Sequence, residues 1–271
     1  MRKFLVVGPN SFISKSINSG EGIIIDKISI RDRTNIDNID FSNYESVINC
    51  AIHPNYINET YNQEFDFDFQ LASRAMKSDC HYVMISSRKV YGENSSLFKL
   101  NEGSPKRPID NYGKNKLITE WFIHENFQEN QKSFTIVRCS NVFGYEYGRK
   151  SFLGFCMNQL KNNGHIHFDV SSKVIRDFIP VEYLGEILKL VMERKPIGIF
   201  NLSSNYGLEI GKIPHYLIEG YGSGTFSSDD ENIKDQFILD CSNLERTLGV
   251  EMTHFDYKNI INKIGEKLCK I

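Results

Sequence analysis

Short apolar runs alternate with longer segments of helical spacing through the first half of the chain. The runs are rich in β-branched residues and cover residues 4–7, 28–30, 47–49, 82–85 and 134–137. Between them, residues 63–77 and 111–129 place apolar side chains three and four positions apart, as in an amphipathic helix. Buried strands joined by helices are typical of a parallel sheet with helices on both faces. We therefore predict an α/β fold built on a doubly wound parallel sheet over residues 1–142.

The pattern loosens after about residue 142, where glycines interrupt shorter elements. Helical spacing returns at residues 181–193 and 257–269, and residues 199–202 form one more strand-like run. No repeat or low-complexity linker separates the two halves of the sequence. We predict a smaller C-terminal α/β lobe over residues 143–271, with some of its segments returning to the sheet.

Composition and charge favour a small soluble ligand. The 32 basic and 34 acidic residues leave a net charge of -2, and no long run of either sign suits nucleic acid or a membrane surface. No apolar stretch reaches the roughly 20 residues that cross a bilayer. The six cysteines lack the spacing of a metal site or a disulfide framework, and no secretory pattern precedes the first apolar run. We expect a cytoplasmic protein with reduced thiols, no metal, and no nucleic-acid or membrane partner.

The first strand breaks at Gly8 into a turn and then a predicted helix, as in a dinucleotide-binding turn. In such turns glycines let the backbone approach a pyrophosphate, and the following helix directs its N-terminus toward it. Only the first glycine is present here, because Ser11 and Ser14 occupy the second and third positions. We predict that Gly8, Ser11, Phe12 and Ile13 contact a cofactor; the alternative is an ordinary turn.

The loop after the second predicted strand carries Arg31, Asp32 and Arg33. This is where an acidic residue usually binds the adenosine ribose and a basic one binds a ribose phosphate. Two arginines favour NADP(H) over NAD(H). A solvated charged loop is the alternative, and Asp26 is a competing ribose-binding candidate if the strand ends earlier.

Three side chains suggest carbonyl chemistry. Tyr112 and Lys116 are one helical turn apart, so the ammonium can lie beside the phenol, favour its ionised form and make Tyr112 an acid and base. Ser87 follows a buried strand at the edge where open α/β sheets bind ligands, and it could hydrogen-bond a substrate carbonyl. Taken alone, Ser87 fits a turn serine that satisfies backbone groups better, and the presence of Tyr112 and Lys116 favours the catalytic role.

Seven motifs in order resemble the extended short-chain dehydrogenase/reductases, and among them the NAD-dependent epimerase/dehydratase family of nucleotide-sugar enzymes. They are the Gly8 turn and residues 49–51 (NCA), 86–92 (SSRKVYG), 112–116 (YGKNK), 138–144 (RCSNVFG), 176–181 (RDFIPV) and 200–203 (FNLS). The resemblance implies a Rossmann-type domain that binds NAD(P) and a lobe that binds a nucleoside-diphosphate sugar. It also implies a catalytic triad of Ser87, Tyr112 and Lys116, with Cys50 and Ala51 beside the cofactor.

The same resemblance implies a set of substrate contacts. Asn141 would touch the sugar diphosphate, and Arg176 would pair with a phosphate, as a guanidinium fork can. Arg88 is a further substrate-binding candidate. For Arg176 the alternative is a structural salt bridge with Asp177 or Glu182.

One departure from the family pattern narrows the activity. In the sugar 4,6-dehydratases of this family an Asp-Glu pair follows the catalytic hydroxyl and provides an acid and a base. Arg88 and Lys89 occupy these positions, and two cations cannot provide both functions. The sequence therefore argues against dehydration and leaves a 4-reductase or a 4-epimerase.

Cofactor use distinguishes these two activities. An epimerase holds NAD tightly through oxidation and re-reduction, whereas a reductase exchanges NADPH in each cycle. The weakened glycine turn, Arg31, Arg33 and the short chain favour the reductase. We predict NAD(P)H-dependent reduction of a nucleoside-diphosphate 4-keto-6-deoxyhexose in activated-sugar biosynthesis. The alternatives are a 4-epimerase with tightly bound NAD, a non-catalytic dinucleotide-binding regulatory subunit, and an enzyme for a non-sugar carbonyl compound.

Family members often dimerise through the helices that follow the fourth and fifth strands. Here these helices include the one that carries Tyr112, and its apolar residues Leu117, Trp121, Phe122 and Ile123 could face a partner or the sheet. We expect a homodimer.

Overall fold

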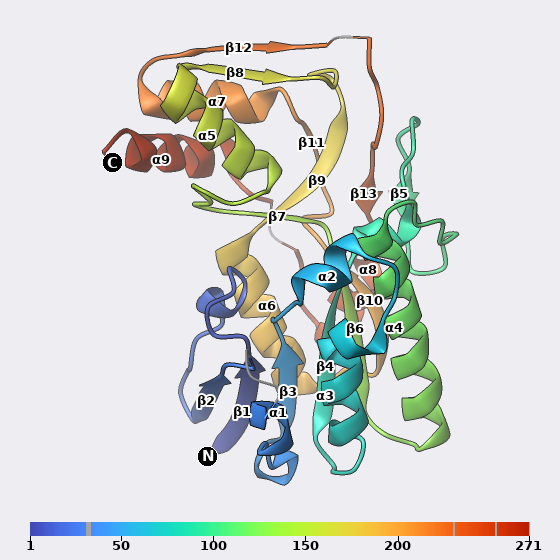
Figure 1. The fold of residues 1–271 in the computed structure, drawn as a ribbon. Helices are drawn as coiled ribbons and strands as arrows, with labels where there is room; N and C mark the ends of the chain where they lie inside the picture. The colour runs from blue at the N-terminus through green and yellow to red at the C-terminus, as the bar shows by residue number, and fades with distance from the viewer. Residues whose placement is uncertain (31–33, 230, 253, 271) are drawn as a thin grey trace.

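A six-stranded parallel sheet forms the lower part of the molecule in Figure 1. The computed structural model describes residues 1–30, 34–229, 231–252 and 254–270, so the predicted ribose-phosphate residues Arg31, Asp32 and Arg33 lie outside the described residues. The strand order is β10-β6-β4-β3-β1-β2, which confirms the predicted Rossmann-type doubly wound sheet. The strands are β1 (Arg2–Val7), β2 (Ile23–Ile28), β3 (Ser46–Asn49), β4 (His81–Ser87), β6 (Phe134–Cys139) and β10 (Gly198–Leu202).

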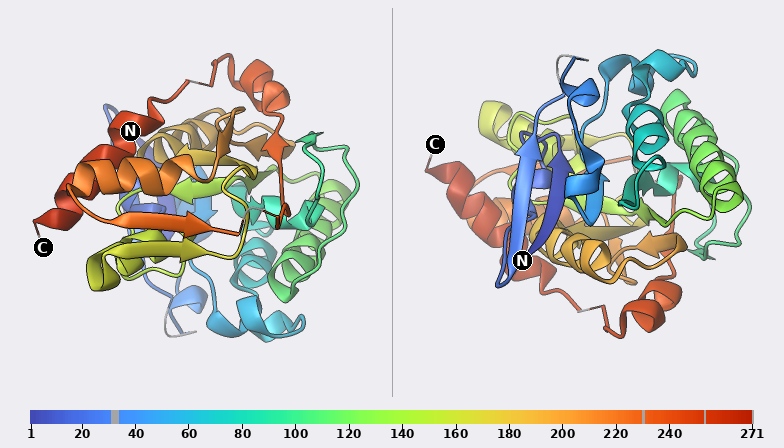
Figure 2. Two further views of the ribbon diagram at one scale, coloured as in Figure 1. Left: turned by 90° about the horizontal axis from the view of Figure 1, so that it is seen from above. Right: turned by 90° about the horizontal axis from the view of Figure 1, so that it is seen from below.

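Helices cover both faces of this sheet because successive strand residues point to opposite sides. Leu5 and Val7 pack with α3 (Phe67–Ala75) and α4 (Asn111–Glu129). Phe4 and Val6 pack with α6 (Val181–Arg194) and α8 (Ser242–Leu248). Figure 2 shows α3 and α4 on one side of the sheet and α6 on the other.

Three predicted elements differ from the structure. β2 spans Ile23–Ile28 where a strand was predicted at residues 28–30. The helix predicted over residues 63–77 is divided at Asp66 into the 3-10 turn η3 (Gln63–Phe65) and α3, because the Asp66 carboxylate accepts the Phe69 amide and caps α3.

The third difference lies next to the Gly8 turn. The structure has only η1 (Ser14–Ser16), a single 3-10 turn, in place of the predicted helix. Serines in and before η1 form hydrogen bonds with the nearby backbone, and these bonds compete with those of a helix. The Ser11 hydroxyl accepts the Ser14 amide, and the Ser16 hydroxyl donates to the Ile13 carbonyl. The turn therefore lacks the helix N-terminus that the prediction placed beside a pyrophosphate.

A smaller unit lies over the carboxyl ends of the strands and has its own apolar core (Figure 1). Its helices are α5 (Phe152–Asn163), α7 (Lys212–Tyr221) and α9 (Tyr257–Cys269), and its outer strands β8 (His165–Phe168) and β12 (Thr225–Ser228) pair in parallel. A three-stranded sheet of β7 (Asn141–Phe143), β9 (Ile175–Pro180) and β11 (Gly207–Glu209) connects it to the main sheet.

Short elements complete the described chain: α1 (Thr34–Asp37), η2 (Phe41–Asn43), α2 (Pro54–Asn58), η4 (Arg88–Tyr91), and the paired strands β5 (Lys99–Leu100) and β13 (Ile238–Leu239). Of the helices in the described part of the chain, none is both long and apolar enough to span a bilayer.

Candidate active site

Ser87, Tyr112 and Lys116 converge where β4 meets the start of α4. Ser87 is the last residue of β4, where its hydroxyl accepts the Lys89 amide at 3.2 Å, and its side chain lowers in part the pKa of Tyr112 in the first turn of α4. The carboxylate of Asp110 accepts the Gly113 amide at 2.7 Å and thereby starts the helix. Gly113 is needed for close approach, because a Cβ there would lie 2.7 Å from the carbonyl oxygen of Lys89 in η4.

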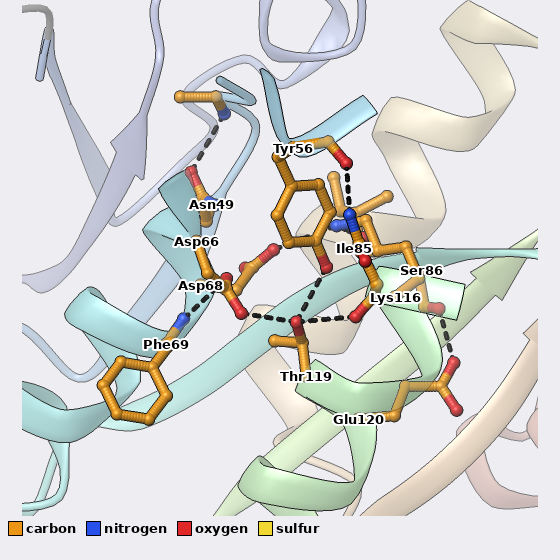
Figure 3. A network of polar contacts seen from close by, with 12 residues as sticks. Asn49, Tyr56, Asp66, Asp68, Phe69, Ile85, Ser86, Lys116, Thr119 and Glu120 are labelled. Carbon is orange, nitrogen blue, oxygen red and sulfur yellow. Dashed lines mark hydrogen bonds and ion pairs between the residues drawn. The ribbon is translucent and has the colours of Figure 1, made fainter. Parts of the chain in front are cut away.

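Lys116 is buried in a polar network that the sequence analysis missed (Figure 3). Its ammonium donates to Asp68 Oδ2 at 3.0 Å and to the Ile85 carbonyl at 2.8 Å. It also lies 5.4 Å from the centre of the Tyr56 ring. Asp68 comes from the first turn of α3 and accepts the Tyr82 hydroxyl at 2.7 Å. Its position between Phe67 and Phe69 was the available signal, since a carboxylate between two aromatic residues of a helix is a candidate for burial beside a cation.

The pKa of Tyr112 reflects burial as well as the predicted effect of Lys116. Burial raises the pKa of Tyr112, Lys116 lowers it in part, and Cys139 and Asp68 raise it further. Lys116 thus acts on the phenol in the predicted direction, but burial outweighs it and the net shift of the pKa is upward. Burial by itself would lower the pKa of Lys116, but Asp68 and Tyr112 outweigh burial and raise it. The lysine is therefore held as a cation and the tyrosine as a neutral phenol.

A cavity of about 440 Å³ lies at the carboxyl ends of β1 and β3. It brings together four of the predicted cofactor residues, Gly8, Ser11, Cys50 and Ala51. Gly8 has a φ of +86°, and a Cβ there would lie 2.8 Å from the Ala51 amide nitrogen, so the two turns touch.

The other two residues of the predicted turn lie elsewhere. Phe12 lines a separate cavity of about 860 Å³ between the turn and α6, and Ile13 packs against the core of the sheet. The competing ribose candidate Asp26 lies within β2, where it pairs with Lys3 at 2.9 Å and accepts the Tyr44 hydroxyl.

On the substrate side, Asp235 binds both predicted arginines. It forms a buried ion pair with Arg88, and its carbonyl accepts the Arg176 Nε at 3.0 Å. The second Arg176 contact, to the Asp235 carboxylate, is 3.5 Å long. Of the two alternative partners considered from sequence, Asp177 and Glu182, Asp177 instead accepts the hydroxyl of Ser204 at 2.8 Å.

Arg176 also lines a cavity of about 440 Å³ in the smaller unit, together with Phe152, Phe155 and His167. Asn141 begins β7, which pairs with the strand that carries Arg176. The substrate roles of Asn141 and Arg176 stay predictions. So does that of Arg88, whose guanidinium already has Asp235 as a partner. Within the residues that the structure describes, no cluster of three His, Cys, Asp or Glu side chains could hold a metal.

Comparisons with known proteins agree with this geometry. The model of the NAD dependent epimerase/dehydratase family matches residues 6–203. Human dTDP-D-glucose 4,6-dehydratase is 27% identical over 157 residues, which cover 57% of this chain and 44% of that protein. The chain thus spans less than half the length of this relative.

Solved structures show the same fold. UDP-N-acetylglucosamine 4-epimerase from Methanobrevibacter ruminantium M1 aligns with a TM-score of 0.82 at 16% identity, over 98% of this chain and 97% of that one. RMD from Pseudomonas aeruginosa, solved with NADPH, aligns with a TM-score of 0.79 at 14% identity, over 100% and 99%. From the family match over most of its length, the chain belongs to the NAD dependent epimerase/dehydratase family.

Proposed function

We propose that this protein reduces the 4-keto group of a nucleoside-diphosphate 4-keto-6-deoxyhexose with NADPH. A nicotinamide bound at the carboxyl edge of the sheet would supply the hydride for C4. Ser87 hydrogen-bonds the substrate carbonyl, and Tyr112 donates its phenol proton to the oxygen as negative charge develops there. Lys116 holds Tyr112 in place and binds the cofactor ribose.

The cofactor residues fit a dinucleotide. Gly8, Ser11 and Ala51 form a cradle at the ends of two parallel strands, where open α/β sheets bind such ligands. The contact between Gly8 and Ala51 leaves no space for a Cβ, so the backbone itself faces the cavity. The preference for NADPH rests on Arg31 and Arg33 in the sequence.

Two cations after Ser87 argue against dehydration. Arg88 forms a buried ion pair with Asp235, and Lys89 pairs with Asp110 at 3.1 Å and Glu93 at 3.7 Å. Neither side chain can act as the carboxylic acid that protonates a departing hydroxyl.

The observation that favours reduction over epimerisation is the single 3-10 turn η1 after Gly8. A full helix would direct its N-terminal amides and dipole toward the pyrophosphate and strengthen its binding. Without that helix the cofactor is held less tightly. Weak binding suits an enzyme that must release the oxidised cofactor after every turnover, and it does not suit an epimerase that keeps its cofactor.

The test is a spectroscopic assay with NADPH or NADH and a panel of dTDP-, GDP-, CDP- and UDP-linked 4-keto-6-deoxyhexoses. We expect loss of reduced cofactor with one of them. Tyr112→Phe should still bind NADPH but lower kcat by about 10²- to 10⁴-fold, the usual contribution of a general acid. Tyr221→Phe, in the outer helix α7, is the control and should retain full activity. NAD that co-purifies with the protein, with no oxidation of NADPH by any ketosugar, would instead support the epimerase.

A further inference from the structure

The ammonium of Lys116 has few donors left for other partners. A lysine carries three N–H donors, and here one is used by Asp68 and another by the Ile85 carbonyl. Both charged side chains are buried, with 6% and 5% of their surface exposed. One donor is therefore available for Tyr112 or a ribose, and it belongs to a cation whose charge is already compensated.

Asp68 is held in this position by the surrounding structure. The Tyr82 hydroxyl donates to Oδ1 at 2.7 Å, while Lys116 uses Oδ2 at 3.0 Å. Asp68 also lies in the first turn of α3, where the helix dipole stabilises a carboxylate. Each oxygen thus has its own donor, and removal of the carboxylate charge would leave Lys116 as an uncompensated buried cation.

Among the residues that the structure describes, the other titratable groups that face Tyr112 add no positive charge. Burial raises the pKa of the Cys139 thiol to about 12, and burial also raises the pKa of Tyr56. Ser87, from β4, is uncharged. The local field at the phenol is thus set mainly by Lys116 and its counter-ion Asp68.

We propose that Asp68 is a positioning residue that compensates the charge of Lys116, so that Tyr112 remains a neutral phenol ready to donate its proton to a carbonyl oxygen. This inference rests on the proposed ketoreduction. In that step a C–H bond of the reduced nicotinamide would break, so that the cofactor is oxidised and its hydride forms the new C–H bond at C4 of the ketone. The Tyr112 O–H bond breaks, and a new O–H bond forms on the sugar, which is reduced to the alcohol. Solvent then returns a proton to the phenolate. A compensated lysine favours this direction, whereas an uncompensated one would favour tyrosinate, the base needed for alcohol oxidation.

The experiment compares pH profiles of kcat for ketosugar reduction in wild type and Asp68→Asn, which keeps the side-chain shape and removes the charge. Reduction requires the protonated phenol, so activity falls as the pH rises through the pKa of Tyr112. We expect this fall to move to lower pH by about 1–3 units in Asp68→Asn, as expected for a cation that has lost its counter-ion. Asp66→Asn is the matched control, because Asp66 is equally buried but bonds Thr119 instead of Lys116, and its profile should move much less. An unchanged profile in Asp68→Asn would overturn the inference.

A second measurement needs neither substrate nor an Asp68 variant. Ultraviolet difference titration of wild type against Tyr112→Phe reports the ionisation of this one phenol. We expect no tyrosinate from Tyr112 at neutral pH, and ionisation near pH 7 would refute the inference even if Asp68→Asn does not fold. A high phenol pKa in a protein that reduces no ketosugar would refute the proposed function alone. Active reduction with an unshifted Asp68→Asn profile would refute the role of Asp68 alone.

Discussion

Removal of the Glu120 carboxylate should destabilise the protein strongly. Glu120 lies in α4, two turns after Tyr112, and is 2% exposed. It accepts the Arg138 guanidinium through Nε at 3.1 Å and through a terminal nitrogen at 2.7 Å, and it also accepts the Ser86 hydroxyl. Glu120→Ala would leave the Arg138 charge buried with only neutral partners, of which the Tyr91 hydroxyl at 3.0 Å is one.

The size of the effect follows from the burial of this pair. Breaking a buried ion pair by removing one partner costs about 3–5 kcal/mol. The unfolding entropy is about 2.1 cal/mol/K per residue, or about 0.6 kcal/mol/K for 271 residues, so Tm should fall by about 5–9 °C. Scanning calorimetry or thermal unfolding followed by circular dichroism measures this shift directly.

Two further variants make the result decisive. Glu219→Ala removes a carboxylate from the exposed pair with Lys258, so its Tm should fall by less than about 2 °C. The double variant Glu120→Leu/Arg138→Met replaces both buried charges with apolar groups and should recover most of the loss. If the Tm of Glu120→Ala fell no further than that of Glu219→Ala, the reasoning on buried charge would be refuted.

Two other predictions concern the Gly8 turn and Asp66, the residue that caps α3. Gly8→Ala should raise the dissociation constant for NADPH at least tenfold in calorimetric titration, because the new Cβ would be strained at a φ of +86° and would collide with Ala51. Gly148→Ala is the control, since Gly148 has a φ of +83° but open space around it, and this variant should bind NADPH normally. Equal affinities of the two variants would contradict the prediction. Burial and the adjacent Asp68 raise the pKa of Asp66 from 3.8 to about 6, so the native state loses up to about 3 kcal/mol as pH rises from 4 to 6. The stability of Asp66→Asn relative to wild type, measured by urea unfolding, should therefore increase between pH 4 and pH 7, and a constant difference would argue against this assignment.

The local pattern of apolar and polar residues was sufficient to predict most of the sheet and part of the candidate active site. The strands that carry Val7, Asn49 and Ser87 are short buried runs, and their carboxyl ends necessarily share one edge of a parallel sheet. The i and i+4 spacing of Tyr112 and Lys116 placed them on one face of α4 in advance. These predictions depend on the spacing of apolar residues and on the positions of polar residues relative to them, and both can be seen directly in a sequence.

The parts that could not be predicted depend on contacts between distant segments or on competition within a turn. Asp68 and Lys116 belong to different helices, and Arg88 meets Asp235 from the other half of the chain. No local pattern encodes such pairs. The absence of a helix after Gly8 depends on serine side chains that compete for backbone groups. The spacing of apolar residues gives no information about this competition.

The short connection after Gly8 also affects the order in which the sheet can assemble. β1 pairs with β2 from Arg2 and Ile23, whereas β6 pairs with β10 from Thr135 and Gly198, across about three times as much chain. Loop-closure entropy grows with the logarithm of length, so the β1–β2 pairing costs about 1 kcal/mol less to close. Chain entropy therefore favours formation of the nucleotide-binding edge before the edge formed by β10, and the Gly8 turn can take shape early in folding.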